Sequence, residues 1–265
     1  MMPHTDPLTD TLALLRDSSD LRVWSVIITL MGDLTMTGTP DANAPGVSGQ
    51  ALGKIMSAIG IRPEATRVAL HRLRKDGWID STRHGRRSVY RLSENGLGQT
   101  RSVADRIYGP ARTAPDRWHL VALPPHTEDD GRFVALIAEG FSEVLPGVFL
   151  GEKAPQTIGD ALHLSDSQMR LPDWVTQRLA PAKLRNDIAQ LQIAISRLNQ
   201  GTLPRLPVLD RTALRLVLLH EWRRIALRLP DLPVEALCPE LQVRADLQSI
   251  LTTLGPVQID ALTET

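Results

Sequence analysis

The sequence predicts an α+β fold, and three observations predict it. Residues 48–92 show a helix, a short turn, a helix and a tight hairpin rich in arginine. Residues 117–151 show a strand, a helix and a strand, and the chain from Pro181 onward has helical periodicity. With 265 residues the chain is long enough to bury a substantial core. We therefore expect three domains, at residues 1–108, 109–172 and 173–265.

An apolar helix is expected over residues 21–31. Val23, Ile27 and Leu30 share one of its faces. The nearly apolar stretch covers only residues 23–31, whereas a membrane span needs about 20 residues, so we expect a buried helix and no membrane partner. Residues 32–47 are rich in Gly, Pro, Thr and Asn, which predicts a loop.

Cysteine content and the N-terminal sequence favour a cytoplasmic protein. Cys238 is the single cysteine, so one chain can form neither an internal disulfide nor a thiolate-rich zinc site. Residues 1–20 are polar and acidic, and they lack the apolar segment of a signal peptide. We expect no metal and no cofactor.

Two further helices follow, each with a start signal. Ser48 is a good N-cap for a helix through about Ala58. After a turn at residues 60–62, Pro63 suits the first position of the next helix, and Gly77 is placed to end it.

The helix over residues 63–76 is amphipathic. Ala65, Ala69, Leu70 and Leu73 lie on one side, and Val68 and Glu64 lie at the edge of the other. That other side holds the candidate DNA-reading residues Arg67, His71, Arg74 and Lys75. Arginine can bond guanine O6 and N7, and valine can contact a thymine methyl. The alternative is a solvated helix whose Arg74 and Lys75 complement the helix dipole.

Residues 78–83 and 88–92 predict two strands joined at His84-Gly85-Arg86-Arg87. Glycine as the first central residue fits a type II′ turn. The tip presents four basic or potentially basic side chains: Arg83, His84, Arg86 and Arg87. These side chains can hold phosphates or enter the minor groove, although a merely soluble turn is the alternative. Two helices followed by such a hairpin predict a winged helix-turn-helix that binds double-stranded DNA. Ser93 can cap a helix through about Tyr108.

The charge is unevenly distributed, although the net charge is zero. Residues 54–110 hold twelve basic and five acidic side chains, and the flanking segments, residues 1–53 and 111–168, are acidic by net charges of −4 and −5. A basic block between acidic ones indicates a localised electrostatic surface for nucleic acid.

The middle and C-terminal parts contain the remaining elements. A strand over residues 117–123, a helix over 131–141 and a strand over 147–151 predict a small ferredoxin-like domain. Helices are predicted from apolar residues at helical spacing: Leu184, Ile188, Leu191, Ile195 and Leu198, and then Leu214, Val217, Leu218 and Ile225. His220 is interpreted as a hydrogen-bonded, partly buried residue, with an effector-site role as the alternative.

The chain resembles the PaaX-like family, the phenylacetic-acid degradation repressors. The resemblance covers nearly all of the chain and rests on Gly32-Asp33, GIRPEATRVALHRLRKDGWI, GRRSVYRLS, GFSEVLPGVF and ALRLVLLHEWRRIALRLPDLP. It implies a winged-helix domain, a ferredoxin-like domain resembling a CRISPR-associated nuclease subunit, and a helical domain. It also implies a homodimeric repressor that an aryl-coenzyme A thioester releases from DNA. Trp222, Arg223 and Arg224 are candidates for contacting that effector.

Two other functions are compatible with parts of the sequence. A metal-dependent nuclease would need a carboxylate at the end of the first middle-domain strand, but Glu128, Asp129 and Asp130 come later, where a solvated loop is expected. A non-catalytic helical assembly module would leave the arginine-rich hairpin unexplained. The sequence contains no nucleophile elbow, P-loop or dinucleotide fingerprint, so we expect a protein that is not an enzyme.

Overall fold

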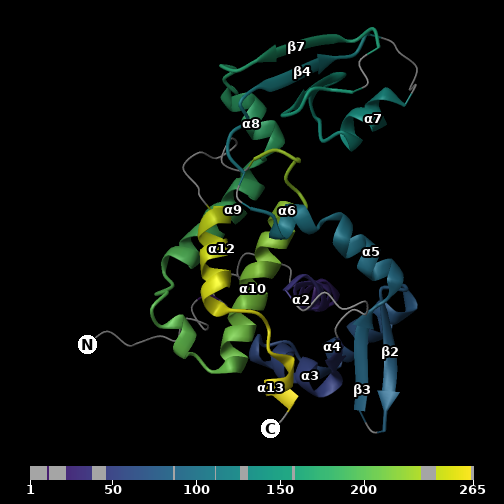
Figure 1. Cartoon of the computed structure of the whole chain (residues 1–265), viewed down its shortest axis with the longest axis vertical. Coiled ribbons are helices and arrows are strands. Elements are labelled where there is room, and N and C mark those ends of the chain that lie inside the picture. The colour runs from purple at the N-terminus through teal and green to yellow at the C-terminus, as the bar shows by residue number, and fades with distance from the viewer. Residues whose placement is uncertain are drawn as a thin grey trace. The chain divides into compact units, whose positions relative to one another are not determined.

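The computed structural model describes residue 11 and residues 22–37, 46–85, 87–110, 112–125, 131–156, 159–233 and 243–263 (Figure 1). It contains helices and two small antiparallel sheets, so the predicted α+β class is confirmed. The chain divides into two compact units. The first unit comprises Met1–Pro110, Gln190–Arg224 and Ala245–Thr265, and the second comprises Ala111–Ala189 and Ile225–Arg244. The division into three domains stays a prediction.

The first described helix of unit 1 is α2 (Val23–Thr37), and its central residues are buried. The predicted loop over residues 32–47 is wrong for Gly32–Thr37, where the helix continues. Asp33 is buried on α2 and is paired with Arg215. This ion pair gives the carboxylate of Asp33 a partner inside the protein. The sequence near Asp33 does not reveal that partner, because Arg215 lies far away in the chain. Residues 38–45 lie outside the described residues.

Helices α3 (Gly49–Ala58) and α4 (Pro63–Lys75) begin and end where the sequence predicted. The Ser48 hydroxyl accepts a hydrogen bond from the Ala51 amide at 3.1 Å, which caps α3. Pro63 occupies the first turn of α4. Gly77 follows α4 with φ +70°, and the Trp78 amide bonds the Leu73 carbonyl at 2.9 Å, so the chain turns sharply out of the helix.

A three-stranded sheet follows, with the order β1-β3-β2. Its strands are β1 (Val47–Ser48), β2 (Ile79–His84) and β3 (Arg87–Leu92). His84 pairs with Arg87, which leaves a two-residue connection at Gly85 and Arg86. Gly85 has φ +60°, as the first central residue of a type II′ turn requires.

The other helices of unit 1 follow the hairpin directly or come from the C-terminal part of the chain. The hydroxyl of Ser93 caps α5 (Glu94–Ser102), and α6 (Ala104–Tyr108) follows after a break at Val103. The long helix predicted around His220 is α10 (Val208–Ala226). The others are the short helix η1 (Leu203–Arg205), α12 (Val243–Leu254) and α13 (Ile259–Thr263). Helix α9 (Ala182–Ser196) is divided between the two units at Gln190, and it buries Leu184, Ile188, Leu191 and Ile195, as predicted.

Unit 2 contains a four-stranded antiparallel sheet with the order β5-β6-β4-β7. The predicted elements are present as β4 (Trp118–Ala122), α7 (Arg132–Ala138) and β6 (Val148–Gly151). The sequence did not predict β5 (Ser142–Leu145) or β7 (Leu162–Asp166), and α8 (Asp173–Leu179) follows the sheet. Between Gly151 and Leu162 the described residues form no helix, so a complete ferredoxin-like pattern stays a prediction.

Candidate nucleic-acid interface

The inner face of α4 is apolar and fixes the helix in unit 1. Ala69, Leu70 and Leu73 are buried, and α4 packs against α2, α3 and β2. Figure 1 shows α4 next to the hairpin formed by β2 and β3. Burying three apolar side chains on one stripe leaves the opposite face of the helix turned away from the core.

The outer face of α4 is basic and exposed. It carries Arg67, His71, Arg74 and Lys75, all of them exposed. Among the described residues, no carboxylate forms an ion pair with any of these four, whereas the neighbouring Arg72 pairs with Asp76 at 3.4 Å. Val68 is 70% exposed beside them. This face therefore offers unpaired cationic donors and one apolar contact, which is the chemistry that a base edge and its phosphates require.

The hairpin adds basic side chains to the same unit. Arg83 and Arg87 are exposed near its tip. Arg86 and the side chain of His84 lie outside the described residues. The structure thus brings six of the eight predicted DNA-binding residues onto exposed positions of α4 and the hairpin.

A buried polar network holds α2, against which α4 packs. Arg215 of α10 donates to both carboxylate oxygens of Asp33, at 2.6 and 2.8 Å. Its third nitrogen donates to the carbonyls of Leu251 and Gly255, at 2.7 and 3.1 Å. The sequence analysis missed this pair. An arginine within the apolar stretch ALRLVLLH was the available signal, since a buried guanidinium needs a carboxylate partner.

His220 is also part of the packing of α10 on α2, as predicted. Its ring Nδ1 lies 3.1 Å from the hydroxyl of Thr29. Burial, together with the charges of Arg223 and Arg224, lowers the pKa of His220 to about 3. His220 is therefore neutral at physiological pH.

The three candidate effector residues lie on the same helix and make contacts within unit 1. Trp222 is 1% exposed, and its indole N–H donates to the Ile107 carbonyl at 2.9 Å. Arg223 donates to the Ser25 hydroxyl at 3.1 Å, and burial lowers its pKa. Arg224 pairs with Glu221 at 2.8 Å. An effector role for these residues stays a prediction.

The next observations concern the nuclease alternative, metal binding and membrane spanning. Glu128, Asp129 and Asp130 lie outside the described residues. The part of the chain that the structure describes holds no group of three or more His, Cys, Asp or Glu side chains that could bind a metal ion. Within the same part, none of the helices combines the length and the apolar character that crossing a bilayer demands.

Comparison with known proteins confirms the resemblance to one family. Residues 22–96 match the family model described as PaaX-like protein. The chain is 28% identical over 211 residues to the transcriptional repressor PaaX of Escherichia coli strain K12, across 71% of this chain and 66% of that protein. The match thus spans slightly less than two thirds of the relative's length. An uncharacterised protein of Mycobacterium tuberculosis has a solved structure that aligns with a TM-score of 0.42 at 20% identity, covering 90% of this chain and 97% of the other.

Proposed function

We propose that this chain, which carries a PaaX-like domain, is a non-enzymatic DNA-binding transcription regulator that acts as a repressor. The observation that carries the proposal is the outer face of α4, where four basic side chains project from a helix whose inner face is buried. The named relative is a transcriptional repressor, which supports the same function.

In this proposal α2, α3, α4 and the sheet β1-β3-β2 form a winged helix-turn-helix. Helix α4 enters the major groove, where Arg67 donates to guanine O6 and N7 and Val68 contacts a thymine methyl. The hairpin places Arg83 and Arg87 against phosphates or in the minor groove. Because sequence-specific proteins of this kind bind two half-sites about 34–36 Å apart, we expect a homodimer. We expect this homodimer to act in the cytoplasm. Sedimentation at micromolar concentration tests the dimeric state, and a monomer that still binds operator DNA would contradict it.

The family resemblance also supports a proposal for the regulated operon and the effector. We propose that the protein represses an aromatic-acid catabolic operon and that an aryl-coenzyme A thioester relieves repression. Adding such thioesters to the DNA complex should release the DNA, whereas free coenzyme A should not. Equal release by both compounds would contradict an aryl-specific effector.

The role of α4 is tested by replacing Arg67 with alanine. If Arg67 reads a base, affinity for the protein's own promoter DNA should fall by about 1–3 kcal/mol, while affinity for random DNA changes little. Arg178→Ala, on α8 of the other unit, is the matched control because it also removes an exposed arginine. Fluorescence anisotropy with both DNAs gives the two affinities. Equal losses on both DNAs would make Arg67 a phosphate contact rather than a base reader.

A further inference from the structure

Helix α4 carries a single acidic residue, Glu64, within its otherwise basic outer face. Counted at about 100° per residue, Glu64 lies opposite Leu73, which is the most deeply buried residue of the helix at 2% exposed. The exposed residues Val68 and His71 follow one and two turns further along the same stripe. Glu64 therefore belongs to the part of α4 that points directly away from the core of unit 1.

The carboxylate of Glu64 is exposed, and no ion pair joins it to a basic side chain of the described residues. Asp76 differs, because it pairs with Arg72 at 3.4 Å just beyond the end of the helix. A negative charge in the first turn of α4 also suits the positive end of the helix dipole. That effect is available to an acid at any exposed position of the first turn, whereas Glu64 lies on the outer stripe with Val68 and His71.

We propose that Glu64 reads a cytosine in the major groove. This inference rests on the proposed function, in which the outer face of α4 enters that groove. A carboxylate only accepts hydrogen bonds, and the donors that bases present there are the amino groups of cytosine and adenine. In adenine the acceptor N7 lies beside the amino group and repels a carboxylate, whereas cytosine has no acceptor on this edge. Guanine and thymine present no donor in the major groove, so Glu64 rejects them.

Glu64 contributes to specificity rather than to affinity. Its charge is repelled by the phosphates of any DNA, and this cost is offset only where a cytosine amino group donates to the carboxylate. Arg67 follows Glu64 after a rise of about 4.5 Å along the helix, which is close to the spacing of about 3.4 Å between base pairs. The guanine contacted by Arg67 and the cytosine contacted by Glu64 therefore lie on the same base pair or on adjacent ones.

Base-by-base substitution of the promoter site tests this role. Each base pair is replaced in turn by the other three, and fluorescence anisotropy gives the affinities of the wild type and of Glu64→Gln. The wild type should lose about tenfold in affinity when one particular cytosine is replaced. Glu64→Gln should bind the site with adenine at that position at least as well as the site with cytosine, because glutamine bonds adenine N6 and N7. Identical base preferences in the two proteins would overturn the proposal.

Random DNA provides a second measurement on the same variant. Glu64→Gln should bind random DNA several-fold more tightly than the wild type, because a negative charge is removed from the face that meets the phosphates. The ratio of promoter affinity to random affinity should therefore fall through tighter non-specific binding. A lower affinity of Glu64→Gln for both DNAs would show that Glu64 acts through the structure of α4, and it would overturn the role in base reading.

Glu94→Gln is the matched control, because Glu94 is an exposed acid in the first turn of α5. Both glutamine variants lose a favourable interaction with a helix dipole, so both should lower Tm slightly. Only Glu64→Gln should change the base preference. Lower Tm values for both variants together with wild-type base preferences would reduce Glu64 to a stabilising residue and overturn the proposal.

The same titrations separate this inference from the proposed function. A wild type that binds promoter and random DNA equally would contradict the proposed function, and the role of Glu64 with it. A wild type that prefers its promoter, together with a Glu64→Gln variant that keeps every base preference, would overturn the role of Glu64 alone.

Discussion

At the scale of single residues, the buried ion pair of Asp33 and Arg215 joins α2 to α10. Their side chains are 2% and 6% exposed. Removing two charges from water is costly, and the cost is offset only by good geometry and by additional hydrogen bonds. Arg215 meets this condition, since it makes two bonds to the carboxylate and two to backbone carbonyls. The pair thus fixes α2 to α10 in one geometry.

Breaking this pair should destabilise the protein strongly. Asp33→Asn leaves the guanidinium of Arg215 buried without a countercharge, which should lower the free energy of unfolding by about 3–5 kcal/mol. Urea unfolding followed by tryptophan fluorescence measures the loss. Asp80→Asn is the control, because Asp80 is exposed on β2. A loss for Asp33→Asn no larger than that of the control would show that the charge of the pair is dispensable.

His220 predicts a specific loss of stability in acid. Its pKa of about 3 in the folded protein lies below the ordinary value of 6.5, so the unfolded chain binds the proton more tightly. The stability contributed by neutral His220 is complete above pH 6.5 and is lost as the pH falls toward 3, by about 1.4 kcal/mol per pH unit. His220→Gln cannot take up this proton. Between pH 6.5 and pH 5, the free energy of unfolding of the His220→Gln variant should therefore fall by about 2 kcal/mol less than that of the wild type. Parallel pH profiles would show that His220 does not titrate in this way.

At the scale of secondary-structure elements, capping determines where α3 begins. Ser48→Ala removes the hydroxyl that accepts the Ala51 amide, and it should lower the free energy of unfolding by about 1 kcal/mol. Ser48→Asp should retain most of the stability, because aspartate also caps helices. Ser57→Ala, an exposed position within the same helix, is the control. Thermal unfolding ranks the variants, and equal Tm values for Ser48→Ala and Ser48→Asp would argue against the cap.

Elements controlled by neighbouring residues were predictable from the sequence. Ser48, Pro63 and Gly77 act within one helical turn, and they correctly marked the start of α3 and both ends of α4. The exposed and buried faces of α4 followed from its periodicity for the same reason. The candidate DNA surface could therefore be described from the sequence, although its role in binding stays a prediction.

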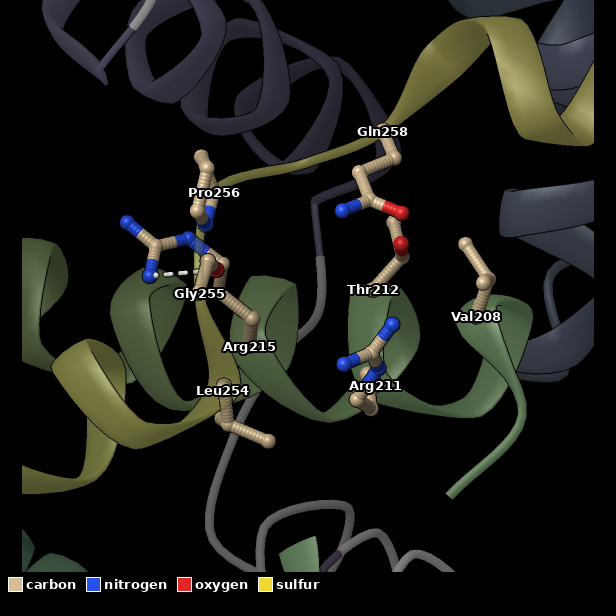
Figure 2. Close-up of a pocket in the computed structure, with 8 residues that line it drawn as sticks. All are labelled: Val208, Arg211, Thr212, Arg215, Leu254, Gly255, Pro256 and Gln258. Carbon is tan, nitrogen blue, oxygen red and sulfur yellow. Dashed lines mark hydrogen bonds between the residues drawn. The ribbon is translucent and has the colours of Figure 1, made fainter. Parts of the chain in front are cut away.

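Features that depend on distant residues were not predictable. Residues 32–37 at the end of α2 looked like the beginning of a loop, because Arg215, which pairs with Asp33, is 182 residues away in the sequence. Strands β5 and β7 are short, and β7 is a strand only through its pairing with β4. The small pocket that Arg211 and Arg215 line (Figure 2) forms where α10 meets the segment after α12, so no local pattern marks it. Each of these features is created by packing between segments far apart in the chain.

At the scale of the whole molecule, a net charge of zero conceals the basic block over residues 54–110, which is +7. A neutral protein without such a block would bind DNA with little dependence on salt. The basic side chains are concentrated on the region of α4 and the hairpin, so their phosphate contacts should release counterions despite the neutral total. If six to ten phosphates are contacted, the affinity should fall by a factor of about 10³–10⁵ when the salt concentration rises from 50 to 200 mM.

The salt dependence should respond to single basic residues of this surface. Lys75→Ala should weaken binding about equally on operator and random DNA, and it should reduce the slope of log affinity against log salt by about one, since one phosphate contact is lost. Arg178→Ala should leave the slope unchanged, because Arg178 lies in the other unit. Anisotropy titrations at four or more salt concentrations, each with both DNAs, provide the slopes. A wild-type affinity that does not change with salt would contradict the electrostatic surface itself, whereas an unchanged slope for Lys75→Ala alone would remove only that residue from it.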